Sequence, residues 1–333
     1  MQALSSEPVA TPQDMLIPDG AEYVAATERV GEIDRSERGK LAVSGLDRAA
    51  FLDSVLSNDI AGIAVGAGAD ATLLTPKGRM LAEVRVLRTD DELALDTERV
   101  CLQALFEALM AFRIGYQVEL HKRTLECGLT SLVGPGSDRL MAPAPPAGEH
   151  AHVASAVGDA QVRAIRTRLG IDLRYAAGEH QRVRAALQAA GAVPIGAATF
   201  ECVRIEHGIA RFGAELDKTT MPQEAGIHER AVSYTKGCYI GQETVARLYW
   251  KGKPNRHLRG LLLTGPAPAG AKLRQGEVEV GVLPAVAISP RLGVVALALV
   301  RREVEPGAVL AVGGTQASAT VVELPFAAVD GAR

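Results

Sequence analysis

Cys238 is the residue whose type and setting best suit chemistry, because it lies in the run KGCYIGQE at residues 236–243. The residues that follow, IGQETVARL, predict a helix, so the sulfur would lie close to a helix N-terminus. Unpaired N–H groups, the positive end of the helix dipole and the Lys236 ammonium would all lower the pKa of the thiol. Gly237 and Gly241 would let the backbone approach a ligand or adopt a positive φ. The run therefore predicts a nucleophilic thiolate.

The alternative for Cys238 is that it packs as a small buried residue, which is the usual fate of a free cysteine. Packing is also sufficient to explain Cys101, Cys127 and Cys202, which fall in expected helices or near a strand-like run. The four cysteines include no C-x-x-C pair, so neither a zinc site nor a disulfide framework is indicated, and we expect a reducing cytoplasm. One thiol cannot hold an iron-sulfur cluster, which normally takes four protein ligands.

Residues 141–160 contain two histidines, His150 and His152, in a stretch rich in Ala, Pro and Gly. Such a composition is typical of a loop or a crossing between subdomains. An H-x-H pair can ligate a metal, but we find no supporting carboxylates or thiols and favour a solvated loop. The sequence therefore predicts no metal site.

Helices and hairpins must position these groups. Residues 44–60 predict a helix with Leu46, Leu52 and Val55 on its inner face, and residues 98–112 predict another. Between them, ATLLT, TPKGR and MLAEVRVLR predict a hairpin, and residues 93–96 predict a further strand. Helices are also expected at 179–190 and 198–207, each ended by a glycine. This mixture favours an α+β fold over a doubly wound parallel sheet.

Three parts are expected along the chain. Residues 1–20 lack both a basic region and an apolar core, so they read as a flexible tail and not as a signal or transit peptide. Residues 21–250 would form the main region, as two interleaved subdomains that cross near 60–70 and 141–160. Short apolar runs separated by Gly and Pro predict a small β-barrel over residues 254–333.

Composition excludes several classes of function. The net charge is −3 and aromatic residues make up only 4%, which argues against nucleic acid as the main partner. No apolar run reaches the roughly 20 residues of a membrane helix, so we expect no membrane partner. A monomer is the default expectation.

The run at 236–243 resembles the hallmark of the YgfZ-type family, a branch of the superfamily that contains the glycine-cleavage T-protein. An Ala-Arg pair follows at Ala246 and Arg247, as in the family. Upstream, RIEHGIARFGAEL from Arg204, MPQEAGI from Met221 and residues 25–110 also resemble superfamily segments. The resemblance implies a T-protein-like clover arrangement of several parts around a central folate pocket, with a tetrahydrofolate or related reduced folate as the cofactor.

Site residues follow from this resemblance. Glu206 falls where the superfamily places a glutamate that binds the pterin ring, although a solvated helix residue is the alternative. Glu83 falls at the catalytic aspartate of the T-protein, with Ala82 in place of a second carboxylate, although a surface ion pair is nearly as plausible. The catalytic candidates are Cys238, Lys236 and Glu83. The folate-binding candidates are Glu206, Glu83, Asp96, Gly237, Gly241, Gln242, Glu243 and Arg247.

Two functions from different classes follow from the resemblance. The first is an accessory protein that binds folate, uses Cys238 and supports assembly or repair of clusters in iron-sulfur enzymes, with those enzymes or cluster-assembly proteins as partners. The second is a tetrahydrofolate-dependent aminomethyltransferase or demethylating enzyme, in which a carboxylate assists proton transfer. The altered carboxylate pair weakens the second, so a conventional enzyme is not expected.

Overall fold

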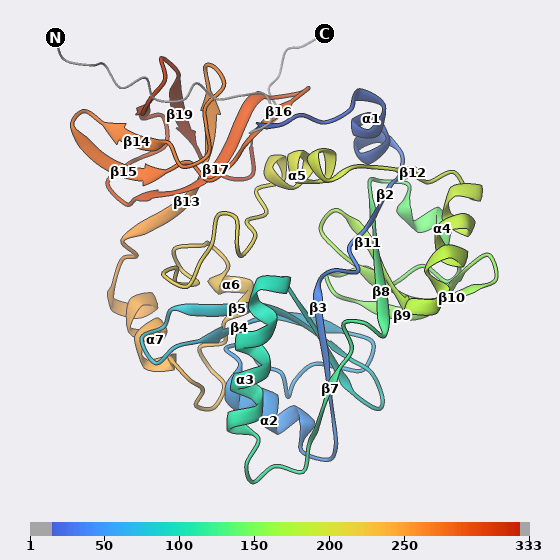
Figure 1. The fold of residues 1–333 in the computed structure, drawn as a ribbon. Helices are drawn as coiled ribbons and strands as arrows, with labels where there is room; N and C mark the ends of the chain where they lie inside the picture. The colour runs from blue at the N-terminus through green and yellow to red at the C-terminus, as the bar shows by residue number, and fades with distance from the viewer. Residues whose placement is uncertain (1–14, 327–333) are drawn as a thin grey trace, which may run out of the picture. The chain divides into compact units, whose positions relative to one another are not determined.

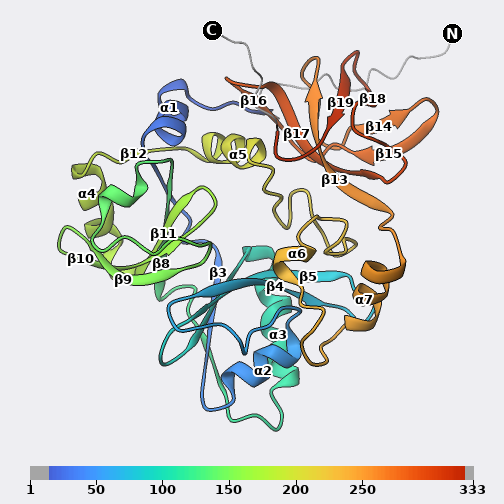
Figure 2. The same cartoon turned by 180° about the vertical axis from the view of Figure 1, so that it is seen from behind.

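The computed structural model describes residues 15–326 and has a mixed α/β fold (Figures 1 and 2). The chain divides into two compact units. The sheet unit comprises residues 21–195 and 216–253, and the barrel unit comprises residues up to 20, 196–215 and from 254 onward. Among the described residues, no helix is long and apolar enough to cross a bilayer.

A five-stranded sheet organises one half of the sheet unit. Its order is β4-β5-β6-β3-β7, and its strands are β3 (Gly39–Ser44), β4 (Gly68–Leu74), β5 (Met80–Arg88), β6 (Leu93–Thr97) and β7 (Glu119–Lys122). The β4–β5 hairpin turns at Thr75, whose carbonyl accepts a hydrogen bond of 2.9 Å from the Gly78 amide. Gly78 has a φ of 71°, which glycine adopts without strain. The predicted hairpin is therefore present.

The two faces of this sheet differ because successive strand residues point to opposite sides. One face is apolar, with residues such as Leu41, Leu73 and Val84 fully buried. Two helices, α2 (Arg48–Val55) and α3 (Leu102–Phe112), lie beside the sheet in both views, and a short 3-10 helix, η2 (Arg99–Cys101), leads into α3. Helix α2 begins at Arg48, with Asp47 as its N-cap, so Leu46 lies outside the helix and is 84% exposed, in contrast to the inner-face position expected for it.

The other face of the five-stranded sheet carries charge. Cross-strand pairs place Asp70 opposite Arg85, Thr72 opposite Glu83, and Arg85 opposite Asp96. Directly paired residues share a face, so the charged side chains gather on one side of the sheet. We call this side the polar face.

A six-stranded sheet forms the other half of the sheet unit, in the order β12-β2-β8-β11-β10-β9. Its strands are β2 (Gly31–Asp34), β8 (Cys127–Val133), β9 (His152–Val157), β10 (Ala160–Arg166), β11 (Gly170–Ala176) and β12 (Val193–Pro194). Val183 and Leu187 of α4 (His180–Ala189) pack into its core. The remaining helices here are α1 (Gly20–Glu28), η3 (Ser137–Leu140) and η4 (Ala177–Glu179).

Within residues 15–326, an apolar cluster and an ion-pair network are among the contacts between the polar face and the six-stranded sheet. Leu87 and Ala94 contact Ile165 of β10. Beside them, the Arg85 guanidinium contacts both Asp96 Oδ2, at 2.5 Å, and Asp172 Oδ2 of β11, at 2.7 Å. A buried cation with two carboxylates thus joins the sheets, with Arg85 Nε donating to Asp96 and Nη1 donating to Asp172.

The segment 216–253 completes the sheet unit along β4 and β5. It contains α6 (His228–Ala231) and α7 (Gln242–Lys251). The Ser57 hydroxyl donates to the Ala231 carbonyl, and the Ser233 amide donates to the Ser57 carbonyl. These bonds hold the segment next to the loop that follows α2.

The barrel unit contains a closed barrel of six strands. The strands are β13 (Arg256–Leu263), β14 (Lys272–Gln275), β15 (Val278–Val282), β17 (Gly293–Arg301), β18 (Val309–Val312) and β19 (Ser318–Val322). The ring closes where β15 pairs with β17. Two further strands extend the sheet at β17, β16 (Val286–Ser289) and β1 (Met15–Leu16). Helix α5 (Ala197–Glu206) belongs to the same unit.

The mixed α/β character and the C-terminal barrel expected from the sequence are confirmed. The predicted tail falls largely on residues 1–14, which lie outside the described residues. The chain passes between the two sheets at residues 35–38 and 123–126, whereas crossings were expected near 60–70 and 141–160. Part of the second stretch is strand β9, because its small residues fit a strand as well as a loop.

The buried network predicts a stability effect for Asp96→Asn. Burial would raise the pKa of Asp96, but Arg85 and Arg38 outweigh burial and hold the pKa well below its usual range. Removing the charge deprives the guanidinium groups of Arg85 and Arg38 of one carboxylate partner. The free energy of unfolding should therefore fall by about 3–5 kcal/mol at neutral pH. Because the folded pKa is lowered, the stabilisation is present above about pH 4 and is lost as the pH falls further.

Urea unfolding of Asp96→Asn and wild type across that pH range checks this expectation. Glu126→Gln is the matched control, since Glu126 forms an exposed ion pair with Arg123 and should change stability by less than about 0.5 kcal/mol. Equal stability of wild type and Asp96→Asn at neutral pH would contradict the role given to the network.

Candidate functional site

Cys238 lies on the surface of the sheet unit, in the loop that precedes α7. Of the four cysteines, Cys101 and Cys202 are buried, Cys127 is half-buried and Cys238 is exposed. Burial raises the pKa of Cys101 to about 11 and that of Cys202 to about 12, so both stay protonated at neutral pH. The alternative that Cys238 is a small buried residue is therefore wrong.

Lys236 anchors this loop. Its ammonium donates to the carbonyls of Asp53, Leu56 and Asn58, and it lies 5.0 Å above the ring centre of Tyr239. An ammonium has three donors, so all three are used by carbonyl oxygens. Lys236 therefore holds the loop, and its activation of the Cys238 thiol stays a prediction.

Gly241 fixes the other end of the loop. It has a φ of 82° and is the N-cap of α7, and a Cβ there would lie 2.5 Å from the Thr75 carbonyl oxygen in the hairpin turn. The Thr244 hydroxyl donates to the Pro76 carbonyl of the same turn. The predicted need for a glycine with positive φ is confirmed at Gly241. Gly237 shows no such need, because its Cβ would meet open space.

The remaining motif residues follow Cys238 into the helix. Helix α7 begins at Gln242, four residues after Cys238. The N-cap is Gly241, so Cys238 does not cap the helix. Gln242 is half-buried, while Glu243 and Arg247 are exposed. Their roles in folate binding stay predictions.

Glu83 points from the polar face toward α6. Its Oε1 accepts a hydrogen bond of 2.8 Å from Arg230, whose guanidinium also pairs with Asp70. Burial raises the pKa of Glu83 above its usual value, although the Arg230 charge acts in the opposite direction. Glu83 thus forms an ion pair, as the alternative for this residue expected, but its carboxylate is partly buried in a charged cluster and not on the open surface.

Asp96 lies on the next strand of the polar face. Arg38 contacts its Oδ1 and Arg85 contacts its Oδ2. Both oxygens therefore serve the network between the sheets, and a structural role accounts for this residue. Its assignment to a folate pocket stays a prediction.

Glu206 belongs to the barrel unit, at the end of α5. Only 3% of the residue is exposed, so the alternative of a solvated helix glutamate is wrong. The Ser289 hydroxyl donates to Oε1, and Arg291 lies 3.5 Å from Oε2. A buried carboxylate with polar partners suits recognition of paired N–H donors.

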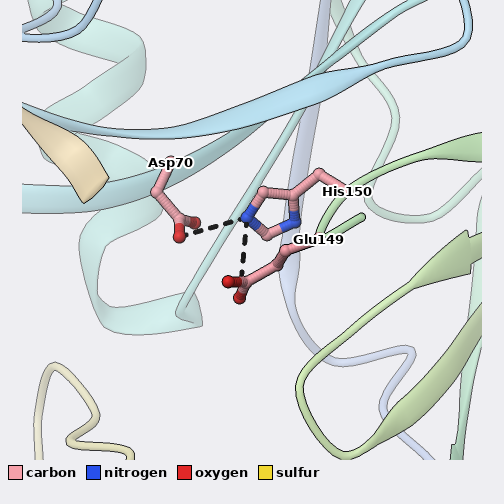
Figure 3. A group of neighbouring side chains, drawn as sticks. All are labelled: Asp70, Glu149 and His150. Carbon is pink, nitrogen blue, oxygen red and sulfur yellow. Dashed lines mark ion pairs between the residues drawn. The ribbon is translucent and has the colours of Figure 1, made fainter. Parts of the chain in front are cut away.

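A third group of side chains lies where β4 meets the loop before β9. Figure 3 shows the His150 imidazole directed at the carboxylates of Asp70 and Glu149. His150 Nε2 lies 3.1 Å from Asp70 Oδ2 and 3.9 Å from Glu149 Oε1. Both His150 and His152 are buried, with 8% and 3% exposed, so the expectation of a solvated loop is wrong.

The sequence pointed to Cys238 and Glu83 but not to the charged residues near Glu83, which are Asp70 and Arg230. Asp70 could have been noticed in the sequence, because it is the charged residue of a strand whose other residues include the buried Ala71 and Leu73. Arg230 gave no comparable signal, because α6 is a four-residue helix with no period to interpret. Glu149 directly precedes His150 and would have supplied the carboxylate thought to be absent.

Comparisons with known proteins give consistent results. The family described as GCVT N-terminal domain matches residues 12–236. A putative chloroplastic transferase of Arabidopsis thaliana is 29% identical over 75% of this chain, which spans 60% of that relative's length. An aminomethyltransferase of Rubrobacter xylanophilus is 26% identical, with 92% of this chain and 85% of the relative covered.

A solved structure shares the fold. The glycine cleavage system aminomethyltransferase T from Bartonella henselae superimposes with a TM-score of 0.83 at 22% sequence identity. The match covers 92% of this chain and 89% of the other. The T-protein-like fold expected from the sequence is thus confirmed.

The anchored loop predicts different results for its two glycines. Gly241→Ala forces a side chain into a positive φ and against the Thr75 carbonyl, so the free energy of unfolding should fall by about 1–3 kcal/mol. Gly237→Ala is the matched control four residues away and should change it by less than about 0.5 kcal/mol. Chemical denaturation of both variants measures the difference, and equal effects would show that the loop is not anchored at Gly241.

Proposed function

Since this chain belongs to the family of the GCVT N-terminal domain, we propose that it is a folate-binding accessory protein that supports iron-sulfur enzymes through the thiol of Cys238. The observation that carries the proposal is the exposure of Cys238 within KGCYIGQE, a run that resembles the hallmark of the YgfZ-type branch. The other three cysteines are buried or half-buried.

The fixed backbone of the loop that carries Cys238 supports a role in which this residue contacts another macromolecule. Lys236 on one side and Gly241 on the other hold the backbone, while Tyr239 is buried and donates to the Ser233 carbonyl. An exposed sulfur on a fixed loop is accessible to the surface of a partner protein. Because one thiol is too few for a cluster, the remaining ligands would come from partners, either iron-sulfur enzymes or cluster-assembly proteins.

The cofactor in this proposal is tetrahydrofolate or a related reduced folate. Glu206 would bind the pterin, and Glu83 would lie at the reacting end. Gly237, Gly241, Gln242, Glu243, Arg247 and Asp96 complete the proposed folate set, with Asp96 the weakest member because two arginines already use its oxygens. We propose that the protein acts as a monomer in the cytoplasm.

A second candidate function is folate-dependent aminomethyl transfer. The relatives named aminomethyltransferase favour it, as does a Glu83 carboxylate whose pKa is raised by burial. A carboxyl group with a raised pKa is better matched to proton transfer near neutral pH. The Arg230 pair opposes this role, because it holds Glu83 in an ion pair.

Deletion of the gene and complementation test the first candidate. Activities of several iron-sulfur enzymes should fall in the deletion strain and recover with the wild-type gene but not with Cys238→Ser. Cys127→Ser is the matched control, since Cys127 is half-buried and accepts a contact from Arg174, and it should restore activity fully. Equal complementation by Cys238→Ser and wild type, at equal protein levels, would refute a role for the thiol.

Purified protein tests the second candidate. With aminomethylated carrier protein and tetrahydrofolate, we expect no release of ammonia and methylene-folate above background. Turnover that falls by about 10²- to 10⁴-fold in Glu83→Gln would instead establish Glu83 as a proton-transfer group and favour the transferase.

A further inference from the structure

His150 is a buried imidazole whose ring nitrogens lack hydrogen-bond partners among residues 15–326. Nε2 lies 3.1 Å from Asp70 Oδ2, an ion-pair contact, whereas Nδ1 has no polar partner among these residues. A buried polar atom without a partner is unfavourable, so such atoms in native proteins call for an explanation such as a bound ion.

Two carboxylates converge on the same nitrogen. One ligand atom from each of Asp70, Glu149 and His150 lies within 4.8 Å of the other two. A tetrahedral cation with bonds of about 2.0–2.2 Å needs ligand atoms roughly 3.3–3.6 Å apart, so a small side-chain movement would bring the three atoms to that spacing. Figure 3 shows that the three side chains come from two elements and point to one place, with Asp70 on β4 and the other two on the loop before β9.

The charge around this group is compatible with a cation. Asp70, Glu83 and Glu149 face two guanidinium groups, those of Arg230 and Arg168. Arg85 also acts on Asp70, but it is itself paired with Asp96 and Asp172. The three carboxylates therefore exceed the two remaining guanidinium charges by one when His150 is neutral. Arg230 competes for Asp70, because its guanidinium pairs with Oδ2. A bound cation would therefore share this carboxylate with Arg230 or use its other oxygen.

We infer that Asp70, Glu149 and His150 form a site for one divalent transition-metal cation of the zinc class. One imidazole nitrogen with two carboxylate oxygens suits Zn²⁺ better than Mg²⁺, which prefers oxygen ligands alone and retains its waters. Three protein ligands leave a coordination position open for water or a substrate oxygen. The site lies within the sheet unit and does not depend on the folate or thiol chemistry proposed above.

Titration of the chelator-treated full chain with Zn²⁺, against a chromophoric competitor, tests the site. We expect one equivalent to bind, and Mg²⁺ not to compete. His150→Ala and Glu149→Gln should each weaken binding by about 10- to 100-fold or more. Glu149 is exposed, so Glu149→Gln keeps the fold even if His150→Ala does not. His121→Ala, at a partly exposed histidine paired with Ser44, is the matched control and should bind as wild type does.

The thiol is the main competing ligand for zinc. Cys238→Ser should therefore keep the full affinity, and Co²⁺ in the wild type should give a d–d spectrum without a sulfur-to-metal charge-transfer band. The inference is overturned if no saturable binding occurs, if Glu149→Gln binds as tightly as wild type, or if binding is lost in Cys238→Ser.

Discussion

The contact of Arg85 with Asp96 and Asp172 is the interaction on which the rest of the sheet unit depends. It joins the two sheets at the polar face, beside a small hydrophobic cluster around Ile165. Buried charges are tolerated only when they are paired, so this contact dictates which carboxylates serve the fold. Asp96 and Asp172 are used there, whereas Glu83 and Asp70 face Arg230 and are the ones left near candidate chemistry.

The β4–β5 hairpin turn packs against the loop that carries Cys238, residues 236–241, although the two are far apart in the sequence. We call this loop the cysteine loop. Thr75 and Pro76 contact Gly241 and Thr244, so the turn determines where α7 begins. The same hairpin carries Asp70 on β4 and Glu83 on β5. A displacement of the turn would therefore move both the cysteine loop and the charged cluster that contains Asp70 and Glu83.

Local patterns predicted the elements well. Apolar periodicity identified α3 through Leu105 and Leu109, and the TPKGR turn identified the β4–β5 hairpin. The pairing of Arg230 with Glu83 spans 147 residues, and no local pattern specifies such a contact. His150 shows the same limit, because its contact is with Asp70 of a strand that lies far from it in the sequence. The structural role of Lys236 was missed for a related reason, since its ammonium bonds to carbonyls of residues 53–58, which lie far from it in the sequence.

The anchoring of the cysteine loop on both sides has a consequence for how the sulfur can be used. Neither anchor involves the side chain of Cys238, because Lys236 bonds to carbonyls and Gly241 packs by its backbone. A bulky adduct on the sulfur, such as a mixed disulfide with another chain, would extend into solvent and leave these supports intact. The geometry of the loop therefore does not depend on what is attached to the sulfur.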